Sequence, residues 1–133
     1  METKLEKGTA VTKSEARAAV RWFKKRMGIA DWKIILEFQN SPPEWLSDKG
    51  CVAAVNRRAT AKKAWLWISA TRAQEDGDTL LVCLFHECLH VAEDDVNLPH
   101  PTSDAAEYLW EQLAAVCETA YLAETKGKRR KKR

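Results

Sequence analysis

The residues of this chain best suited to chemistry lie in the pentapeptide His86-Glu87-Cys88-Leu89-His90, which has the pattern H-E-x-x-H. Residues four apart lie on the same face of an α-helix, so the imidazoles of His86 and His90 can converge on one metal ion. Glu87, about 100° further round the helix, can reach a metal-bound water without being a ligand. The spacing therefore predicts a zinc site with Glu87 as general base.

The residues around the motif predict a buried helix. An apolar run covers residues 80 to 85 before the motif, Val91 and Ala92 follow it, and two of the chain's three histidines lie inside it. The alternative interpretation is an amphipathic helix that carries two histidines and a glutamate by coincidence, with one ring hydrogen bonded in the core. The apolar flanks favour the metal site, because a helix that merely carries charges would be more polar.

Length and composition predict one globular domain. The chain has 133 residues, of which 45% are hydrophobic and 31% are charged, as is usual for a single core. The longest apolar stretch, residues 80 to 85, is far shorter than a membrane span, and the start METKLEKGT does not resemble a signal peptide. We expect a cytoplasmic protein that makes no membrane contact. Its cysteines form no C-x-x-C pair and are expected to be reduced and mostly buried: Cys51, Cys83, Cys88 and Cys117.

The C-terminal residues 126 to 133, KGKRRKKR, carry seven Lys and Arg and no acid. The rest of the chain is mildly acidic, because its remaining 15 cations face 19 acids. A block without apolar residues cannot join a core, so residues 126 to 133 are expected to form a disordered basic tail. Weak, sequence-independent contact with nucleic-acid phosphates is one interpretation of this tail, and a role in solubility alone is the other.

Periodicity and turn signals predict an α+β domain over residues 14 to 125, after a flexible N-terminus over residues 1 to 13. The first helix is expected from Ser14 to Met27, with Ser14 as its cap and Gly28 at its end.

Three strands and two helices should follow. The residues RATAKK are expected to join the second and third strands as a hairpin. The motif helix should take its turn and cap from residues 76 to 79. The expected ranges are 32 to 38, 51 to 57 and 64 to 69 for the strands, 78 to 94 for the motif helix, and 103 or 104 to about 123 for the final helix.

An H-E-x-x-H helix followed by a short break and a second helix with two glutamates one turn apart resembles the gluzincins, the thermolysin-like zinc metallopeptidases. The segments that carry the resemblance are HECLH at 86 to 90 and EYLWEQLA at 107 to 114. It is closest to the small single-domain members, which include many phage and prophage proteins, and as an order of elements it covers residues 14 to 123. The resemblance implies a zincin-like fold with an N-terminal helix, a small three-stranded sheet, the motif helix and a C-terminal ligand helix.

The resemblance also implies roles for individual residues. His86 and His90 would be zinc ligands, Glu87 the general base and acid, Glu107 the third ligand, and Glu111 an outer-shell carboxylate that orients a ligand histidine. Glu107 lies closer to the second histidine than the corresponding glutamate does in larger gluzincins. The choice between Glu107 and Glu111 therefore stays open.

Two further alternatives concern the third ligand. With Asp104 as N-cap, Glu107 would occupy the N3 position of a capping box, which is a purely structural role. His100 is ten residues after His90, but SprT-like proteases have a longer spacing and a neighbouring glycine. A metzincin would need histidine at position 96, where this chain has Val96. We therefore expect His100 in an exposed turn.

Trp65 and Trp67 alternate onto one face of the strand that precedes the motif helix. In zincin-like folds the strand that borders the cleft binds an extended peptide through its backbone, so this face either lines the cleft or packs in the core. Arg57, Arg58 and Tyr108 are candidates for stabilising an oxyanion.

Together these features predict a zinc metallopeptidase that acts on a protein or peptide substrate, with Glu87 taking a proton from zinc-activated water. Two alternatives remain open. One is a non-catalytic zincin-like module with structural zinc, tethered to nucleic acid by its basic tail. The other is a metal-dependent hydrolase that acts on something other than protein.

Overall fold

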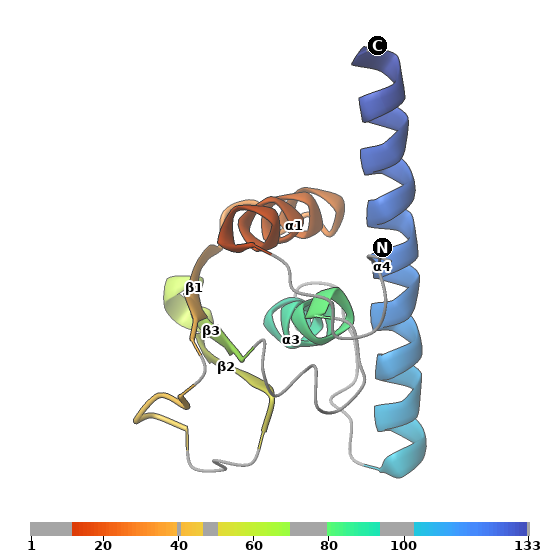
Figure 1. Cartoon of the computed structure of the whole chain (residues 1–133). Helices are drawn as coiled ribbons and strands as arrows, with labels where there is room; N and C mark the ends of the chain where they lie inside the picture. The colour runs from red at the N-terminus through yellow and green to blue at the C-terminus, as the bar shows by residue number, and fades with distance from the viewer. Residues whose placement is uncertain (1–11, 40, 47–50, 70–79, 94–102, 133) are drawn as a thin grey trace.

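The computed structural model describes residues 12–39, 41–46, 51–69, 80–93 and 103–132, with the side chains of the last segment described as far as residue 125. The described residues form an α+β structure of three helices and a three-stranded mixed sheet. Helix α3 lies in the middle, with the sheet on one side, α1 above it and α4 on the other side (Figure 1). This confirms the expected order of elements at the level of fold class.

Helix α1 (Lys13–Arg26) begins at a capping box. The Thr12 hydroxyl accepts a hydrogen bond from the Glu15 amide at 3.1 Å, and the Glu15 carboxylate accepts one from the Thr12 amide at 2.9 Å. The expectation that Ser14 caps this helix is wrong, because the reciprocal pair Thr12 and Glu15 satisfies two amide groups where a single serine would satisfy one. Gly28 follows the helix with φ of 71°, the left-handed conformation that glycine adopts easily.

The sheet consists of β1 (Lys33–Phe38), β2 (Ala53–Arg58) and β3 (Lys63–Ile68) in the order β1-β3-β2. Strand β3 is parallel to β1 and antiparallel to β2. The expected hairpin between β2 and β3 is confirmed, and its connection contains the short helix η1 (Ala59–Ala61) and Lys62 with φ of 49°. Strand β3 is therefore central, whereas β2 is an edge strand.

The two faces of β3 have different surroundings. Its core-facing side chains are Ala64, Leu66 and Ile68. Trp65 and Trp67 point to the opposite face, away from α3. Trp67 is fully buried and donates a hydrogen bond to the carbonyl of Gln39 at 2.8 Å, whereas Trp65 is half-buried beside Arg58 and Lys63, whose charged groups lie 5.4 and 5.0 Å from its ring centre.

Helix α3 (Leu80–Ala92) is almost entirely buried. The Phe85 ring lies 5.6 Å from Trp22 and 6.0 Å from Phe23 of α1, and 5.9 Å from Tyr121 of α4. The thiol of Cys83, one turn before the motif, belongs to the same core, as expected. The turn and cap expected in residues 76 to 79 lie outside the described residues.

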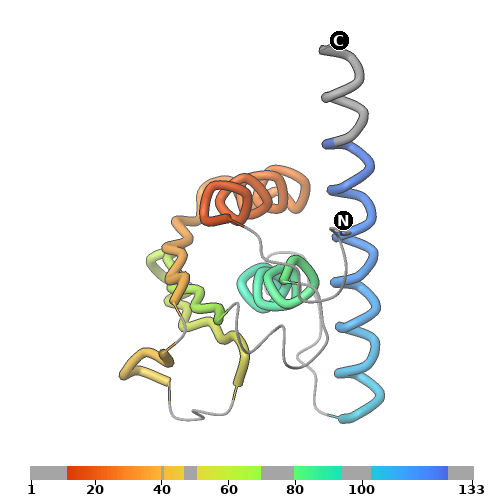
Figure 2. Tube along the Cα trace, in the orientation of Figure 1, coloured from red at the N-terminus to blue at the C-terminus, as the bar shows by residue number. Residues whose placement is uncertain are grey.

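Helix α4 (Asp104–Lys132) begins after Ser103, whose hydroxyl accepts a hydrogen bond from the Ala106 amide at 3.1 Å. The trace follows α4 past α3 and on beyond α1 (Figure 2). The expected end near Ala123 is wrong, since the backbone stays helical to Lys132. Lysine and arginine are good helix formers and their charge suits a helix C-terminus, which favours helix over the irregular tail expected for these residues. Among the described helices, none combines the length and hydrophobicity needed to cross a bilayer.

The capping box of α1 generates a prediction. Thr12→Ala removes the hydroxyl acceptor and should lower the free energy of unfolding by about 1 kcal/mol. Ser14→Ala is the matched control and should be nearly neutral, because Ser14 is exposed inside the first turn. Urea unfolding of both variants checks this, and a larger loss from Ser14→Ala would contradict the assignment of the cap.

Candidate functional site

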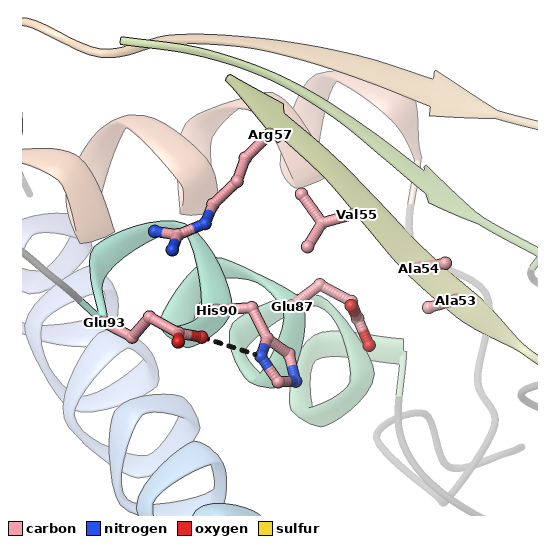
Figure 3. A pocket seen from close by; sticks show the side chains of 7 residues that line it. All are labelled: Ala53, Ala54, Val55, Arg57, Glu87, His90 and Glu93. Atoms are coloured by element: carbon pink, nitrogen blue, oxygen red, sulfur yellow. Dashed lines mark hydrogen bonds and ion pairs between the residues drawn. The ribbon is translucent and has the colours of Figure 1, made fainter. Parts of the chain in front are cut away.

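A cavity of about 400 Å³ lies between α3 and the edge strand β2, within the size range of ligand pockets. Helix α3 contributes Glu87 and His90, Glu93 follows directly after the helix, and β2 contributes the opposite wall (Figure 3). The residues of that wall are Ala53, Ala54, Val55 and Arg57. Two of the three motif residues predicted to do chemistry thus face one accessible space.

The second histidine of the motif has a carboxylate partner that the sequence interpretation missed. His90 Nδ1 lies 3.2 Å from Glu93 Oε1 (Figure 3), and Glu93 is only 8% exposed. A carboxylate accepts a hydrogen bond from Nδ1–H, which fixes the ring tautomer and makes Nε2 the nitrogen that would bind a metal. The spacing His90 to Glu93, three residues on a helix, was the available signal.

The first histidine is also next to a carboxylate. His86 Nδ1 lies 3.1 Å from Glu111 Oε2 of α4. The angles at this contact do not meet hydrogen-bond geometry, so His86 Nδ1 is a buried nitrogen with charge contact but no hydrogen bond among the described residues. Both motif histidines therefore have Nδ1 turned to a carboxylate.

The two imidazoles have a separation compatible with a shared metal. Their ring centres are 5.2 Å apart and their planes differ by 64°. Two imidazoles bound to one tetrahedral zinc at ~2.1 Å would have ring centres about 5 Å apart. Trp110 of α4 packs against the pair, with its ring centre 4.5 Å from His90 and 6.0 Å from His86. This buried indole restricts the rotamers of both rings.

Negative charge is concentrated around Glu87. Burial and, to a smaller extent, the nearby carboxylates of Glu111 and Glu107 together raise the pKa of the Glu87 carboxyl to about 8. These effects show that both glutamates of α4 act on the motif electrostatically. Three carboxyl groups close together repel one another when ionised. A divalent cation bound among them would offset that repulsion.

Among the described residues, no third side chain is placed beside the two histidines to hold a metal. Over the described parts of the chain, no three His, Cys, Asp or Glu side chains converge as a ready metal-binding group. Glu107 is exposed, and its alternative role in a capping box is wrong, because Ser103 is the cap and Ala106 occupies N3. His100 lies outside the described residues.

The three candidates for oxyanion stabilisation lie in different parts of the structure. Arg57 lines the cavity and donates a hydrogen bond from Nη1 to the Val91 carbonyl at 3.4 Å, at the end of α3. Arg58 lies against Trp65 on the other face of the sheet, and Tyr108 is 67% exposed on α4. Of the three, Arg57 is therefore the one placed at the cavity.

The strand that borders the cavity differs from the one proposed on tryptophan positions. Trp65 and Trp67 of β3 point to the sheet face away from α3, whereas residues 53 to 57 of the edge strand β2 line the cavity. Of the two alternatives left open for the tryptophan face, lining of this cavity does not hold, because both rings lie on the sheet face opposite α3.

The cysteines near the motif are poor nucleophiles and ligands. Burial raises the pKa of the Cys88 thiol well above its usual range, and burial likewise raises the pKa of Cys117. A thiolate is the form that binds metals or attacks substrates. The expectation that the thiols are mostly buried is confirmed, with Cys83, Cys88 and Cys117 buried and Cys51 half-buried.

Comparison of the chain with known protein families, with curated protein sequences and with solved structures finds no match in any of the three. The interpretation of the site accordingly rests on the H-E-x-x-H helix and the contacts described above.

The buried Glu87 generates a prediction for metal-free protein. Its ordinary pKa of 4.5 is raised to about 8 in the folded state, so the folded protein keeps a proton that the unfolded chain loses. Wild-type stability should therefore fall between pH 4.5 and 8, with a limiting slope of about 1.4 kcal/mol per pH unit from this group. Glu87→Gln lacks this loss and should gain stability relative to wild type as pH rises.

Urea unfolding with a chelator present, from pH 4 to pH 9, tests this expectation. Glu44→Gln, at an exposed carboxylate, is the matched control and should show no such trend. A difference between Glu87→Gln and wild type that stays constant with pH would contradict the assigned effect of burial.

Proposed function

We propose that this protein is a zinc-dependent metallopeptidase in which His86 and His90 bind the metal through their Nε2 atoms. The observation that carries the proposal is the paired arrangement of the two rings, each with Nδ1 within 3.2 Å of a carboxylate oxygen. Carboxylate partners on the second nitrogen are the usual means by which proteins orient metal-binding histidines.

Helix α4 supplies the candidates for the third ligand. Glu111 lies at Nδ1 of His86, where its carboxylate orients the ring. Glu107 is one turn earlier on the same helix and also raises the pKa of Glu87, which supports a position near the motif. We assign Glu107 as the third ligand and Glu111 as the orienting carboxylate. Glu107 is exposed, so its side chain is not held in another contact by burial.

The cavity provides the groups needed for peptide hydrolysis. Bound zinc would polarise a carbonyl and lower the pKa of its water. Glu87 faces the cavity, where its carboxylate can take a proton from water and return it to the leaving amine.

The edge strand β2 suits an extended substrate. Among the described strands none pairs with β2 on the side away from β3. Backbone groups on that side can therefore hydrogen bond to a peptide laid along the strand. Ala53 and Ala54 at the cavity have small side chains that allow close approach, and Arg57 gives the cavity one cationic wall residue.

Metal content is the first test. Zinc should bind wild-type protein at close to one equivalent, and His86→Ala or His90→Ala should lower the affinity by orders of magnitude, because two donors remain. His100→Ala is the control histidine and should keep the metal. Elemental analysis after dialysis measures this. Wild-type protein that stays metal-free after exposure to zinc would end the proposal.

Catalysis is a separate test. Glu87→Gln preserves the volume of the side chain and leaves both histidines in place, so zinc should remain while peptide cleavage falls by ~10²-fold or more. Digestion of a broad peptide library by wild type and variant, followed by mass spectrometry, gives the comparison. Zinc binding without any cleavage would favour the non-catalytic module.

The third ligand can be assigned with a pair of variants. Glu107→Ala should lower zinc affinity more than Glu111→Ala, because loss of a ligand usually costs more than loss of an orienting group. Competition with a chromophoric zinc chelator measures both affinities. The opposite ranking would make Glu111 the ligand.

A further inference from the structure

The outer face of α4 carries an uncharged stripe. All of its members are exposed, and at 100° per residue they fall within an arc of about 140° on the side of the helix opposite its core contacts. The stripe consists of Ala105, Tyr108, Leu109, Gln112, Ala115, Val116, Thr119, Ala120 and Ala123. It spans 19 residues, a length of about 28 Å.

Helix α1 shows what an ordinary solvent face looks like in this protein. Six of its seven exposed residues are charged, Ser14 being the exception. The stripe of α4 has no charged residue in nine positions, although 31% of the chain is charged. Every large hydrophobic side chain found exposed among the described residues also lies on it, with Tyr108, Leu109 and Val116 at 67%, 55% and 63% exposure. A continuous apolar face of this kind indicates an interface.

The stripe also forms a hollow that a side chain could enter. A depression of about 540 Å³ runs along α4 between Glu111 and Ala123. Its walls include the small residues Ala115, Thr119 and Ala120. Small residues along a helix face allow a second helix to approach closely.

We propose that this stripe pairs with the same stripe of a second copy of the chain, with the two α4 helices antiparallel. The charge distribution along α4 favours a second copy of the chain as the partner, and it favours antiparallel over parallel pairing. Its exposed charges near the start are the acids Asp104, Glu107 and Glu111, whereas residues 126 to 132 of the same helix contain six Lys and Arg. Parallel pairing would place the two basic ends together, and antiparallel pairing places each basic end beside an acidic one.

In an antiparallel register centred on Val116, residues of the stripe in one copy lie opposite residues of the stripe in the other. Val116 then faces its own copy at the two-fold axis, Leu109 lies opposite Ala123, and Gln112 lies opposite Ala120. Large side chains thus meet small ones, as close helix packing requires. The contact is self-complementary, which is the property of a closed two-fold dimer. Glu111 borders the stripe, so the second copy would lie beside the candidate metal centre without supplying a ligand to it.

The dimer does not depend on the metallopeptidase proposal and is tested on the full chain without metal. Wild type should show a concentration-dependent monomer–dimer equilibrium in analytical ultracentrifugation. Val116→Glu places two like charges at the axis and should raise the dissociation constant at least tenfold. Arg21→Gln, which changes the charge by the same amount on exposed α1, should leave it unchanged. Thermal unfolding of dilute Val116→Glu should match monomeric wild type, because Val116 is 63% exposed.

Cross-linking tests the direction of pairing. Under oxidation, an equal mixture of Leu109→Cys and Ala123→Cys proteins should give a mixed disulfide dimer, whereas each variant alone should give no more than wild type. Cross-linking of each variant with itself would overturn the antiparallel arrangement. Wild type that stays monomeric up to several hundred micromolar would overturn the dimer and leave another occupant, such as residues 1 to 11 of the same chain, for the stripe.

Discussion

The burial of helix α3 is the constraint on which the rest of the structure depends. The helix packs against the sheet, α1 and α4, and nine of its 13 residues are buried. A helix in this position should be apolar throughout, yet it carries Glu87 and two histidines. Each of these polar groups loses hydration on burial, so the surrounding elements must supply partners for them.

The partners come from three places in the chain. Glu93 at the end of α3 contacts His90, Glu111 of α4 contacts His86, and Arg57 of β2 donates to the last turn of α3. Burial in the same helix raises the pKa of the Glu87 carboxyl. The polar groups are thus gathered on the side of α3 that meets α4 and the sheet edge, while its other side packs through Phe85 and its neighbours in a hydrocarbon core. Concentrated carboxylates and imidazoles in one partly buried location are a common mark of a functional site.

Local signals in the sequence were enough to predict the helices and strands but not their arrangement in the fold. Alternation and turn residues placed all three strands to within two residues, and helical spacing placed the motif on α3. The strand order β1-β3-β2 could not be derived, because each strand is short and apolar enough for the centre of a sheet. The sequence also left open whether Trp65 and Trp67 line a cleft or pack in the core. The cap of α1 was missed although the Thr12-x-x-Glu15 pattern is local, and the extent of α4 was underestimated because charge density was weighed above helix propensity.

The candidate site likewise has features that the sequence predicts and features that depend on tertiary packing. The relation of His86, Glu87 and His90 follows from helix geometry alone and needed only the sequence. The contact between His86 and Glu111 joins two helices, and the ring packing of Trp110 on the histidines depends on how α4 crosses α3. Such contacts are set by tertiary packing and cannot be derived from spacing. Glu93 was accessible from its place three residues after His90, but its burial was not.

Binding of zinc by the two motif histidines together with oxygen donors is the central proposal for this protein. X-ray absorption at the zinc edge, on protein loaded with one equivalent of zinc, tests this most directly because it identifies the ligand atoms. We expect one coordination shell of nitrogen and oxygen atoms at ~2.0 to 2.1 Å, which includes two imidazole ligands and no sulfur. A sulfur shell at ~2.3 Å would assign the metal to the cysteines and contradict the account.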